Sequence, residues 1–434
     1  MAFPVVTSRS YADASGAPAK ALRRSLRQKI KDDPTAFAPH LKLARLALED
    51  ENPALAERHI VLASRKGAPE RLCLKQERLL AHRTGNLARE KTVLLKLLDT
   101  TPADTDALKQ LVHVAIALDD ATLALDSCER LLSAGGSAKI IGQALAGLAR
   151  ALPARRVQTF LEGALERFSD VWMLHLAAKQ FETARRLAPS DEARQFIDQV
   201  LAVSAPVGPV LTLPDMQPDI TISGPDRPNG TLLIFASLKD TYGVPAPVLD
   251  LFFAELGLTA VFLHDARRLV YLDGMPTFGE GLQPTLDHLA KRFGEAGKPL
   301  YTLGFSAGAL AALWYGAALQ ARASLVFSPA TTFDVNAHRT IDDRRARAFF
   351  RKLNRRLDAK DYALDTLFDK ARPGYRVTAF CSASAPIDLG HSELLKPYPG
   401  VRVTVLEAVN QHLTFLPAAA RYGLLSVLTD AFNL

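Results

Sequence analysis

The hydrophobic pattern of this 434-residue chain changes near Ala205. Before that point, apolar residues recur at steps of three and four, which is the pattern of amphipathic helices. After it, continuous apolar runs alternate with helical segments, which indicates a mostly parallel sheet covered on both faces. The chain is also too long for one ordinary domain. We therefore expect a flexible tail over 1–19, a helical domain over 20–203 and an α/β domain over 204–434.

The helical part contains breaks at a spacing of about 34 residues. Successive breaks contain Pro34, Pro69, Pro102, Ser137 and Asp170. Two helices in each period of this length are typical of a tetratricopeptide-type solenoid, in which neighbouring units stack and bury a continuous core.

Residues 34–170 resemble the tetratricopeptide family in their small and apolar positions. Alanine recurs in the second helix of each unit, at Ala56, Ala88 and Ala124, whereas most aromatic positions of the family are missing. The resemblance implies a concave groove that binds a peptide or a protein. The alternative is an irregular helical domain that packs on its neighbour.

The α/β part begins with a linker rich in proline and glycine, followed by small antiparallel strands. The main strands are then predicted at 231–238, 259–266, 300–306, 323–330, 375–382 and 401–408. Two charged helices between about 335 and 372 indicate an insertion or a cap.

The segment "LYTLGFSAGALAALWYGAAL" (300–319) places a serine between two glycines where a strand becomes a helix. In a doubly wound sheet, reactive groups lie at the carboxyl ends of the strands. The glycines at 304 and 308 remove side chains that would clash in the tight turn, which lifts the hydroxyl of Ser306 out of the sheet. The amide of Ala307 can then face a developing oxyanion. This pattern is the nucleophile elbow of α/β-hydrolases.

A nucleophilic serine needs a base and a group that orients the base. In this fold the acid and the histidine follow the serine in that order. Asp388 in "SAPIDLGHSELL" and His412 in "NQHLTF" each follow a strand and fit the order. The reserve acid is Asp334.

Three further residues are weaker candidates because of their positions. His264 precedes the serine, and His391 follows Asp388 too closely. Asp265 ends a strand and is either a pocket residue or a structural one. The second oxyanion amide is expected near Ser237 and Leu238, although the usual glycine-rich oxyanion loop is missing.

The C-terminal half therefore resembles α/β-hydrolases. The segments "HDARRLVYLDG", "GFSAGALAALWYG", "VFSPATTFD" and "IDLGHSELL" look more narrowly like bacterial proteins of this fold that are associated with surface-polysaccharide modification. This narrower resemblance implies chemistry on a carbohydrate-linked ester. Tyr271 and Trp314 are the nearest aromatic candidates for stacking on a sugar, and Trp314 is better explained as a core residue.

The leading hypothesis is a serine hydrolase of the esterase type, acting on an acylated, carbohydrate-linked or other substrate. An acyltransferase that uses the same acyl-enzyme is the closest alternative. The second alternative is a non-catalytic scaffold protein with a relic hydrolase fold. Because the Ser–Asp–His machinery lies beyond the linker, a shortened chain starting near residue 205 is expected to retain it, provided that the helices do not cover apolar surface of the hydrolase domain.

Composition limits the partners. The net charge is +7, and about +8 falls in the first hundred residues, without interleaved aromatic residues that would stack on bases. We therefore expect solvated helix faces and no specific nucleic acid. No motif implies a metal or a cofactor. No apolar run is long enough for a membrane span, no signal peptide is expected, and three scattered cysteines suit a cytoplasmic protein.

Overall fold

The computed structural model describes residues 17–50, 52–118, 120–136, 154–203, 220–223, 226–238, 241–265, 269–279, 281–294, 297–343, 353–354, 356–407, 409 and 412–434. Residues 1–16 of the predicted tail, the break at Ser137, most of the linker after Ala205 and most of the first charged insertion helix lie outside these residues. The last three residues of the predicted tail, 17–19, begin a helix instead. Contacts divide the chain into two compact units, Met1–Ser137 and Ala138–Leu434.

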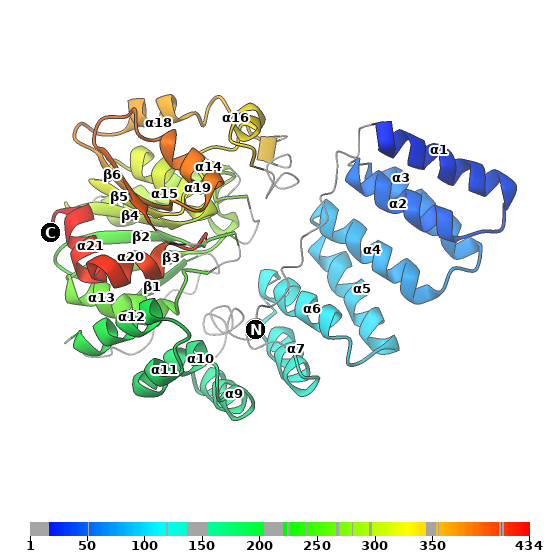
Figure 1. The fold of residues 1–434 in the computed structure, drawn as a ribbon, viewed down its shortest axis with the longest axis horizontal. Helices are drawn as coiled ribbons and strands as arrows, with labels where there is room; N and C mark the ends of the chain where they lie inside the picture. Colours follow the sequence, from blue (N-terminus) through cyan, green and yellow to red (C-terminus); the bar gives the residue numbers. More distant parts are fainter. Residues whose placement is uncertain are drawn as a thin grey trace. The chain divides into compact units, whose positions relative to one another are not determined.

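The first unit consists of helices, each packed against its neighbours in the sequence (Figure 1). They are α1 (Ala17–Asp32), α2 (Ala38–Glu49), α3 (Pro53–Arg65), α4 (Glu70–Thr84), α5 (Leu87–Thr100), α6 (Thr105–Ala117) and α7 (Ala121–Ser133). The helical character predicted for this region is confirmed, whereas a tetratricopeptide-type solenoid stays a prediction.

The same capped turn joins three pairs of these helices. Asn52, Asn86 and Asp120 lie at the N-termini of α3, α5 and α7, and each side chain accepts a hydrogen bond from the amide three residues further on. Each capping residue also donates its own amide to the carbonyl five residues earlier, at 2.8–2.9 Å. These caps recur every 34 residues, so the period seen in the sequence corresponds to a repeated local geometry.

The alanine predicted to be buried in the second helix of each pair is buried in two of the three pairs. Ala56 and Ala124 are fully buried, but Ala88 is exposed. The residue 34 positions from both buried alanines is Glu90, which is also fully buried. Its carboxylate lies 3.5 Å from Arg78 and 3.2 Å from His82, which supply the polar partners that a buried carboxylate requires.

Replacement of a cap should destabilise the first unit. Asn86→Ala removes the acceptor for the amide of Arg89, at 3.0 Å, and should lower the free energy of unfolding by about 1 kcal/mol. Asn86→Asp keeps an acceptor at the same place and should be nearly neutral. Urea unfolding followed by circular dichroism measures both changes, and equal stabilities of the two variants would contradict the capping role.

The second unit combines a seven-stranded sheet with helices. Its strands are β1 (Ile220–Ser223), β2 (Thr231–Phe235), β3 (Thr259–Leu263), β4 (Leu300–Phe305), β5 (Ala323–Phe327), β6 (Arg376–Ser382) and β7 (Val401–Leu406). The strand order is β1-β3-β2-β4-β5-β6-β7, and every pair is parallel except β1 with β3. All six predicted main strands are therefore confirmed, and their carboxyl ends meet at one edge of the sheet.

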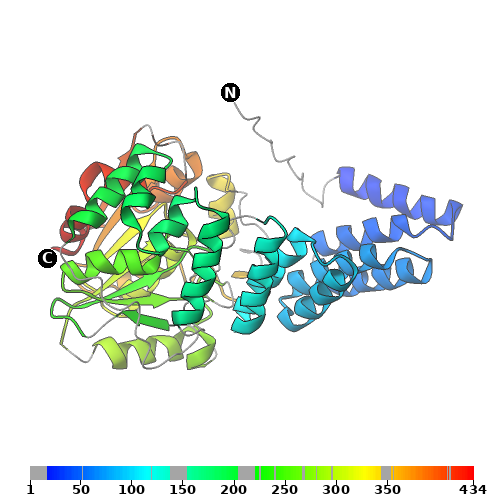
Figure 2. The same ribbon diagram turned by 90° about the horizontal axis from the view of Figure 1, so that it is seen from below.

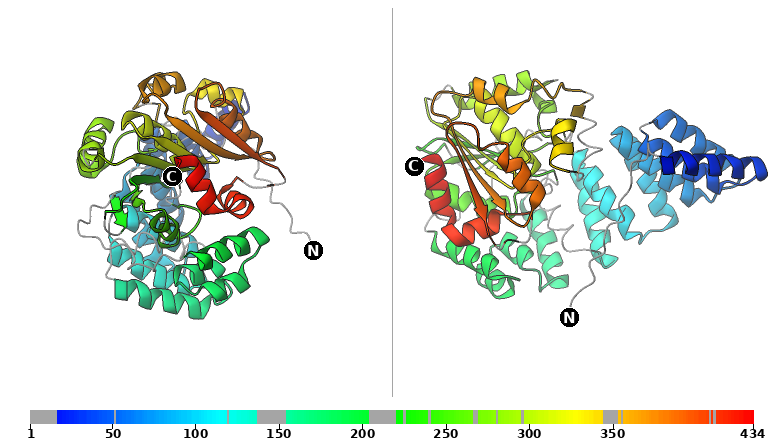
Figure 3. Two further views of the ribbon diagram at one scale, coloured as in Figure 1. Left: turned by 90° about the vertical axis from the view of Figure 1, so that its left-hand side faces the viewer. Right: turned by 45° about the horizontal axis from the view of Figure 1, so that its top comes forward.

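The helices of this unit cover both faces of the sheet (Figure 2). They are α9 (Ala154–Arg167), α10 (Trp172–Ala177), α11 (Phe181–Leu187), α12 (Asp191–Ala202), α13 (Ala246–Glu255), α14 (Leu282–Leu289), α15 (Ala307–Ala318), α16 (Val335–Thr340), α18 (Leu364–Lys370), α19 (Pro386–Glu393), α20 (Phe415–Tyr422) and α21 (Leu424–Phe432), with the short 3-10 helix η1 (Pro276–Phe278) and the short π-helix η2 (Ala290–Gly294). One face packs against α12, α13, α20 and α21, and the other against α14, α15 and α18. Figure 3 shows the C-terminal helix α21, in red, beside strands β5 and β6.

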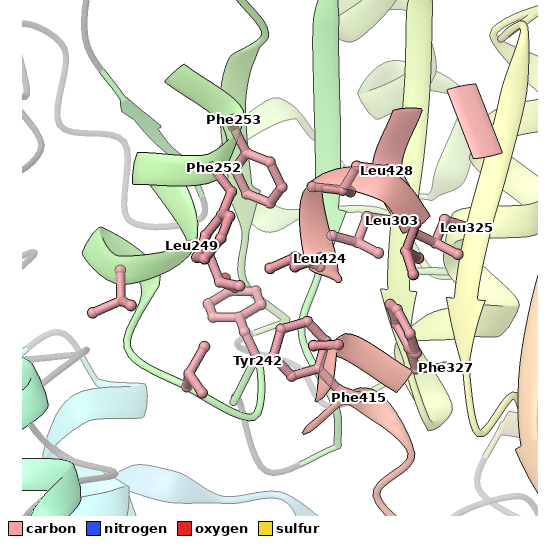
Figure 4. Close-up of a cluster of buried hydrophobic side chains, with 14 of the residues drawn as sticks. Tyr242, Leu249, Phe252, Phe253, Leu303, Leu325, Phe327, Phe415, Leu424 and Leu428 are labelled. Atoms are coloured by element: carbon pink, nitrogen blue, oxygen red, sulfur yellow. The ribbon is translucent and has the colours of Figure 1, made fainter. Parts of the chain in front are cut away.

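The boundary predicted near Ala205 does not separate the two units. Helix α12 precedes this point, yet Phe196 is fully buried against Phe252 and Phe415 of the sheet unit, with ring centroids 5.7 and 5.8 Å apart. Figure 4 shows Phe252 and Phe415 in this core. The side chain of Gln199 also bridges two C-terminal helices: it donates to the carbonyl of Ala419 and accepts from the amide of Leu424. The helices over 154–202 therefore belong with the sheet, which corrects the predicted domain limits.

None of the helices within the described ranges has the length and apolar character that crossing a bilayer requires.

Candidate active site

Ser306 lies in a strained turn between β4 and α15. Its backbone has φ 53° and ψ −117°, a conformation that a residue with a Cβ rarely adopts. The end of β5 and the segment that follows it hold this turn on both sides. The Ser306 amide donates to the carbonyl of Phe327 at 2.9 Å, and its carbonyl accepts from the amide of Ala330 at 3.1 Å. The strain is thus maintained by hydrogen bonds to the neighbouring strand.

The two glycines that flank the serine allow close backbone approaches. A Cβ at Gly304 would lie 2.6 Å from the Cα of Ala309, and a Cβ at Gly308 would lie 2.2 Å from the carbonyl oxygen of Ala236. Neither backbone atom can move away without displacing α15 or the end of β2. Glycine at both positions therefore lets the helix begin directly behind the serine.

The structure brings Ser306, His412 and Asp388 into one chain of hydrogen-bond contacts. The Oγ of Ser306 lies 2.7 Å from the Nε2 of His412, and the Nδ1 of His412 lies 2.6 Å from the Oδ2 of Asp388. The Asp388 side chain is fully buried, whereas that of His412 is 37% exposed. When Nδ1–H donates to the carboxylate, the lone pair of Nε2 is left to accept the serine proton.

The loop that carries His412 is held by two side chains that the sequence did not single out. The hydroxyl of Ser328 donates to the carbonyl of His412, and its oxygen accepts from the amide of Thr414 at 3.2 Å. The hydroxyl of Thr414 donates to the carbonyl of Phe380 at 3.2 Å. Ser328 immediately follows β5 in "VFSPATTFD". Its position at the carboxyl edge of the sheet is the feature from which the sequence could have identified it as a site residue.

The other predicted acids and bases have different partners. Asp334 caps α16 and accepts from the amides of Asn336 and Ala337 at 3.3 and 3.1 Å. His391 is fully buried on α19, where its Nε2 lies 3.1 Å from Asp343. His264 is buried with its ring 5.9 Å from that of Tyr242.

A small cavity of about 20 Å³ contains the predicted oxyanion residues. Its lining includes Ser237, Leu238, Asp265 and Ala307. The amide of Ala307 is in the first turn of α15, where an N–H has no acceptor within the helix. The amide of Ser237 donates to the carbonyl of Thr241 at 3.0 Å, so it is engaged in its own turn. Of the two amides predicted after β2, that of Leu238 is therefore the better candidate.

Tyr271 lines the same cavity but offers no face for a sugar. Its side chain is 2% exposed and contacts Phe235 edge-on, with ring centroids 5.1 Å apart. Its hydroxyl accepts from the amide of Ala236 and donates to the carbonyl of Leu263, both at 3.0 Å. Tyr271 thus ties β3 to the end of β2, and this placement does not suit the predicted substrate-stacking role. Trp314 is 3% exposed and packs on Tyr362, as expected for a core residue.

A second cavity, of about 70 Å³, opens beside Ser306. It is lined mainly by apolar side chains: Phe305, Phe327, Leu413, Phe415 and Leu416, with Ser237, Thr241, Gly243, Ser328 and Thr414 completing the wall.

The cysteine nearest to Asp388 in the sequence is Cys381 on β6. Its side chain is fully buried, and burial raises the pKa of its thiol. A buried, protonated thiol does not compete with the serine as a nucleophile.

Comparisons with known proteins give distant likenesses only. No family model and no curated protein sequence matches the chain. Similar solved structures include a fluorophosphonate-binding serine hydrolase of Staphylococcus aureus (13% identity, 48% of this chain and 91% of that one, TM-score 0.34). A capsule O-acetyltransferase of Neisseria meningitidis (14%, 49% and 95%, TM-score 0.33) and an alpha/beta hydrolase from a lagoon-sediment metagenome (13%, 46% and 88%, TM-score 0.31) are also similar. Such scores carry no argument about function, which must come from the geometry of the site.

Proposed function

We propose that this chain is a serine hydrolase that cleaves short-chain acyl esters at Ser306. The observation that carries the proposal is the continuous contact from Ser306 through His412 to the buried Asp388, at a strained strand-to-helix turn. A relic hydrolase fold in a scaffold protein would have no need to maintain the strain at Ser306.

The proposed reaction passes through an acyl-enzyme. The Oγ of Ser306 attacks the ester carbonyl while Nε2 of His412 takes its proton, and Asp388 stabilises the imidazolium. The amides of Ala307 and Leu238 receive the oxyanion. As the tetrahedral intermediate collapses, His412 returns the proton to the departing alkoxide, which leaves as an alcohol. Water then attacks the acyl-enzyme with His412 again as the base, and the acid and free Ser306 are formed.

The size and lining of the cavity beside Ser306 suit a substrate with a small, apolar acyl group. One water molecule needs roughly 10–15 Å³ of such space, so there is room for on the order of five non-hydrogen atoms. Its aromatic and leucine lining suits an acetyl-to-butyryl chain better than a sugar. The carbohydrate-linked substrate and the protein partner of the helical repeats rest on the resemblances alone and stay predictions.

Hydrolysis is favoured over acyl transfer by the exposure of the base. The His412 side chain is 37% exposed, so water can reach the position from which it would attack the acyl-enzyme. Efficient transfer to an alcohol requires that water be excluded at this step. Measuring free acid and transesterified product in the presence of glycerol distinguishes the two outcomes, and a large excess of ester product would favour the acyltransferase.

The direct test of the nucleophile is labelling by a fluorophosphonate probe, which reacts with activated serines. The wild-type chain should be labelled at Ser306, as read by peptide mass spectrometry, and Ser306→Ala should not be labelled. Ser384→Ala, which changes an exposed serine, is the matched control and should label normally. Absence of labelling in folded wild-type protein would contradict the proposal.

Two isosteric variants separate the candidate acids. Asp388→Asn leaves His412 in the wrong tautomer and should lower kcat by about 10⁴. Asp334→Asn keeps a good cap for α16 and should leave kcat nearly unchanged, because asparagine and aspartate cap helices about equally well. Steady-state hydrolysis of p-nitrophenyl acetate measures both. The reverse order of effects would assign the acid to the segment after β5.

A further inference from the structure

Three side chains with metal-ligating chemistry lie together outside the contacts that join Ser306, His412 and Asp388. His338 is in α16, Asp343 follows that helix, and His391 is in α19. One ligand atom from each lies within 4.8 Å of the other two. The three residues are 6%, 5% and 0% exposed, respectively. The cluster thus has the composition of a transition-metal site and is shielded from solvent.

The hydrogen bond of His338 directs one ring nitrogen toward the centre of this cluster. Its Nε2 lies 2.9 Å from the carbonyl oxygen of Thr332, which can only accept, so Nε2 carries a proton. In a neutral imidazole with its proton on Nε2, the lone pair is on Nδ1. This Nδ1 lies 3.7 Å from the carboxylate of Asp343. A ligating histidine commonly donates its other N–H to a backbone carbonyl in the same way.

His391 approaches the same carboxylate from α19. Its Nε2 lies 3.1 Å from Oδ2 of Asp343. Its Nδ1 lies 3.1 Å from the hydroxyl oxygen of Thr331, whose own proton goes to the carbonyl of His391. The amide of Thr331 is 3.3 Å from Nδ1, so without a cation Nε2 holds the ring proton. With a cation bound at Nε2, the ring proton is on Nδ1 instead; the Thr331 hydroxyl oxygen accepts it, and the 3.3 Å hydrogen bond from the Thr331 amide is lost.

We propose that His338, Asp343 and His391 bind a Zn²⁺ ion, with a fourth position open to one more ligand. Two imidazole nitrogens and one carboxylate suit Zn²⁺, whereas Mg²⁺ and Ca²⁺ prefer oxygen ligands. Bonds of the usual length put the ligand atoms of a tetrahedral site about 3.3 Å apart. The carboxylate of Asp343 lies 3.1 Å from the nitrogen of His391 and 3.7 Å from that of His338, one just below and one just above this value. The two imidazole nitrogens need to approach each other by at most about 1.5 Å.

The ion would connect the segment after β5 to the helix that carries Asp388. His391 is three residues beyond Asp388 on α19, so the two residues are neighbours on one face of this helix, and a bound ion would help to fix the helix that carries the proposed acid. The site differs from the prediction that the chain has no metal, which rested on the lack of a short ligand motif. It does not depend on the proposed esterase activity.

The experiment uses the untagged full-length chain, because a histidine tag would itself bind the ion. The protein is treated with a chelator, dialysed against Zn²⁺ or Mg²⁺ separately, and analysed for bound metal and Tm. We expect one Zn²⁺ per chain, no retained Mg²⁺ and a higher Tm with Zn²⁺, since a ligand that binds only the folded state stabilises it. Failure of the folded chain to retain Zn²⁺ would overturn the proposal.

Variants locate the bound ion. His338→Gln and Asp343→Asn should each weaken Zn²⁺ binding by at least about 10- to 100-fold and remove the rise in Tm, because each loses a direct ligand. His175→Gln is the matched control: this histidine is also buried, but its nitrogens contact Gln180 and Ser169 at 2.7 and 2.8 Å. Equal Zn²⁺ affinity in all variants, or loss of the ion only after alkylation of cysteines, would refute the site. If one of the two variants fails to fold, the Zn²⁺ affinity of the other still tests the site.

Discussion

Ser306→Ala should lower kcat for p-nitrophenyl acetate by about 10⁶, the scale of losing a triad serine. The variant removes the oxygen that attacks the ester in the proposed mechanism and leaves the imidazole of His412 without its 2.7 Å partner. The acetyl group fits the apolar cavity beside the serine, so a small activated ester reports on the chemistry and requires no further recognition surface.

The fold should be nearly unaffected by this change. Alanine, like serine, has a Cβ, so the backbone strain at φ 53° is unchanged. The hydrogen bond that the described residues show for the Ser306 hydroxyl, to His412, is lost, which costs about 1 kcal/mol. Circular dichroism and Tm should therefore match the wild type. Ser384→Ala controls for the substitution itself. If Ser306→Ala kept most of the turnover, another group would be the nucleophile, and the roles proposed for Asp388 and His412 would also be wrong.

The sequence predicts the sheet and its carboxyl edge well because both depend on local patterns. Strands buried on two faces are rich in apolar residues, and this pattern located the buried strands β2–β6. The more exposed strand β7 was located by the β-branched residues of "VRVTVL". The turn at Ser306 has a similarly local cause, since Gly304 and Gly308 are required by backbone approaches within the turn. The expectation that Asp388 and His412 converge on the serine followed from their positions after successive strands.

Features that depend on tertiary partners could not be predicted in this way. The apolar stripe of α12 shows that one face is buried but not which unit buries it, so the domain boundary was placed too late. Tyr271 looked like an accessible aromatic because nothing local reveals that its hydroxyl bonds to Ala236 and Leu263. The cluster formed by His338, Asp343 and His391 has no local motif, because its last member is 48 positions after Asp343.

The shortened chain 205–434 should fail to fold, although it contains Ser306, Asp388 and His412. It lacks α12, whose Phe196, Ile197 and Val200 are 0–3% exposed in the core of the sheet unit. Full burial of three such side chains stabilises the fold by roughly 5–9 kcal/mol, taken together. This is comparable with the total stability of a typical domain, about 5–15 kcal/mol. The surface left open would include Phe415, which lines the cavity beside the nucleophile.

The matched comparison is the chain 138–434, which keeps α9–α12 together with the sheet. It should melt cooperatively and hydrolyse p-nitrophenyl acetate with a kcat/KM close to that of the full chain, because every residue of the proposed mechanism and its packing partners is present. Phe196→Ala in the full chain is the finer test, and it should cost about 3–5 kcal/mol, as for other large aromatic truncations in cores. A soluble, cooperatively folded 205–434 with wild-type activity would show that α12 is dispensable. A folded but inactive 138–434 would mean that the first unit completes the active site.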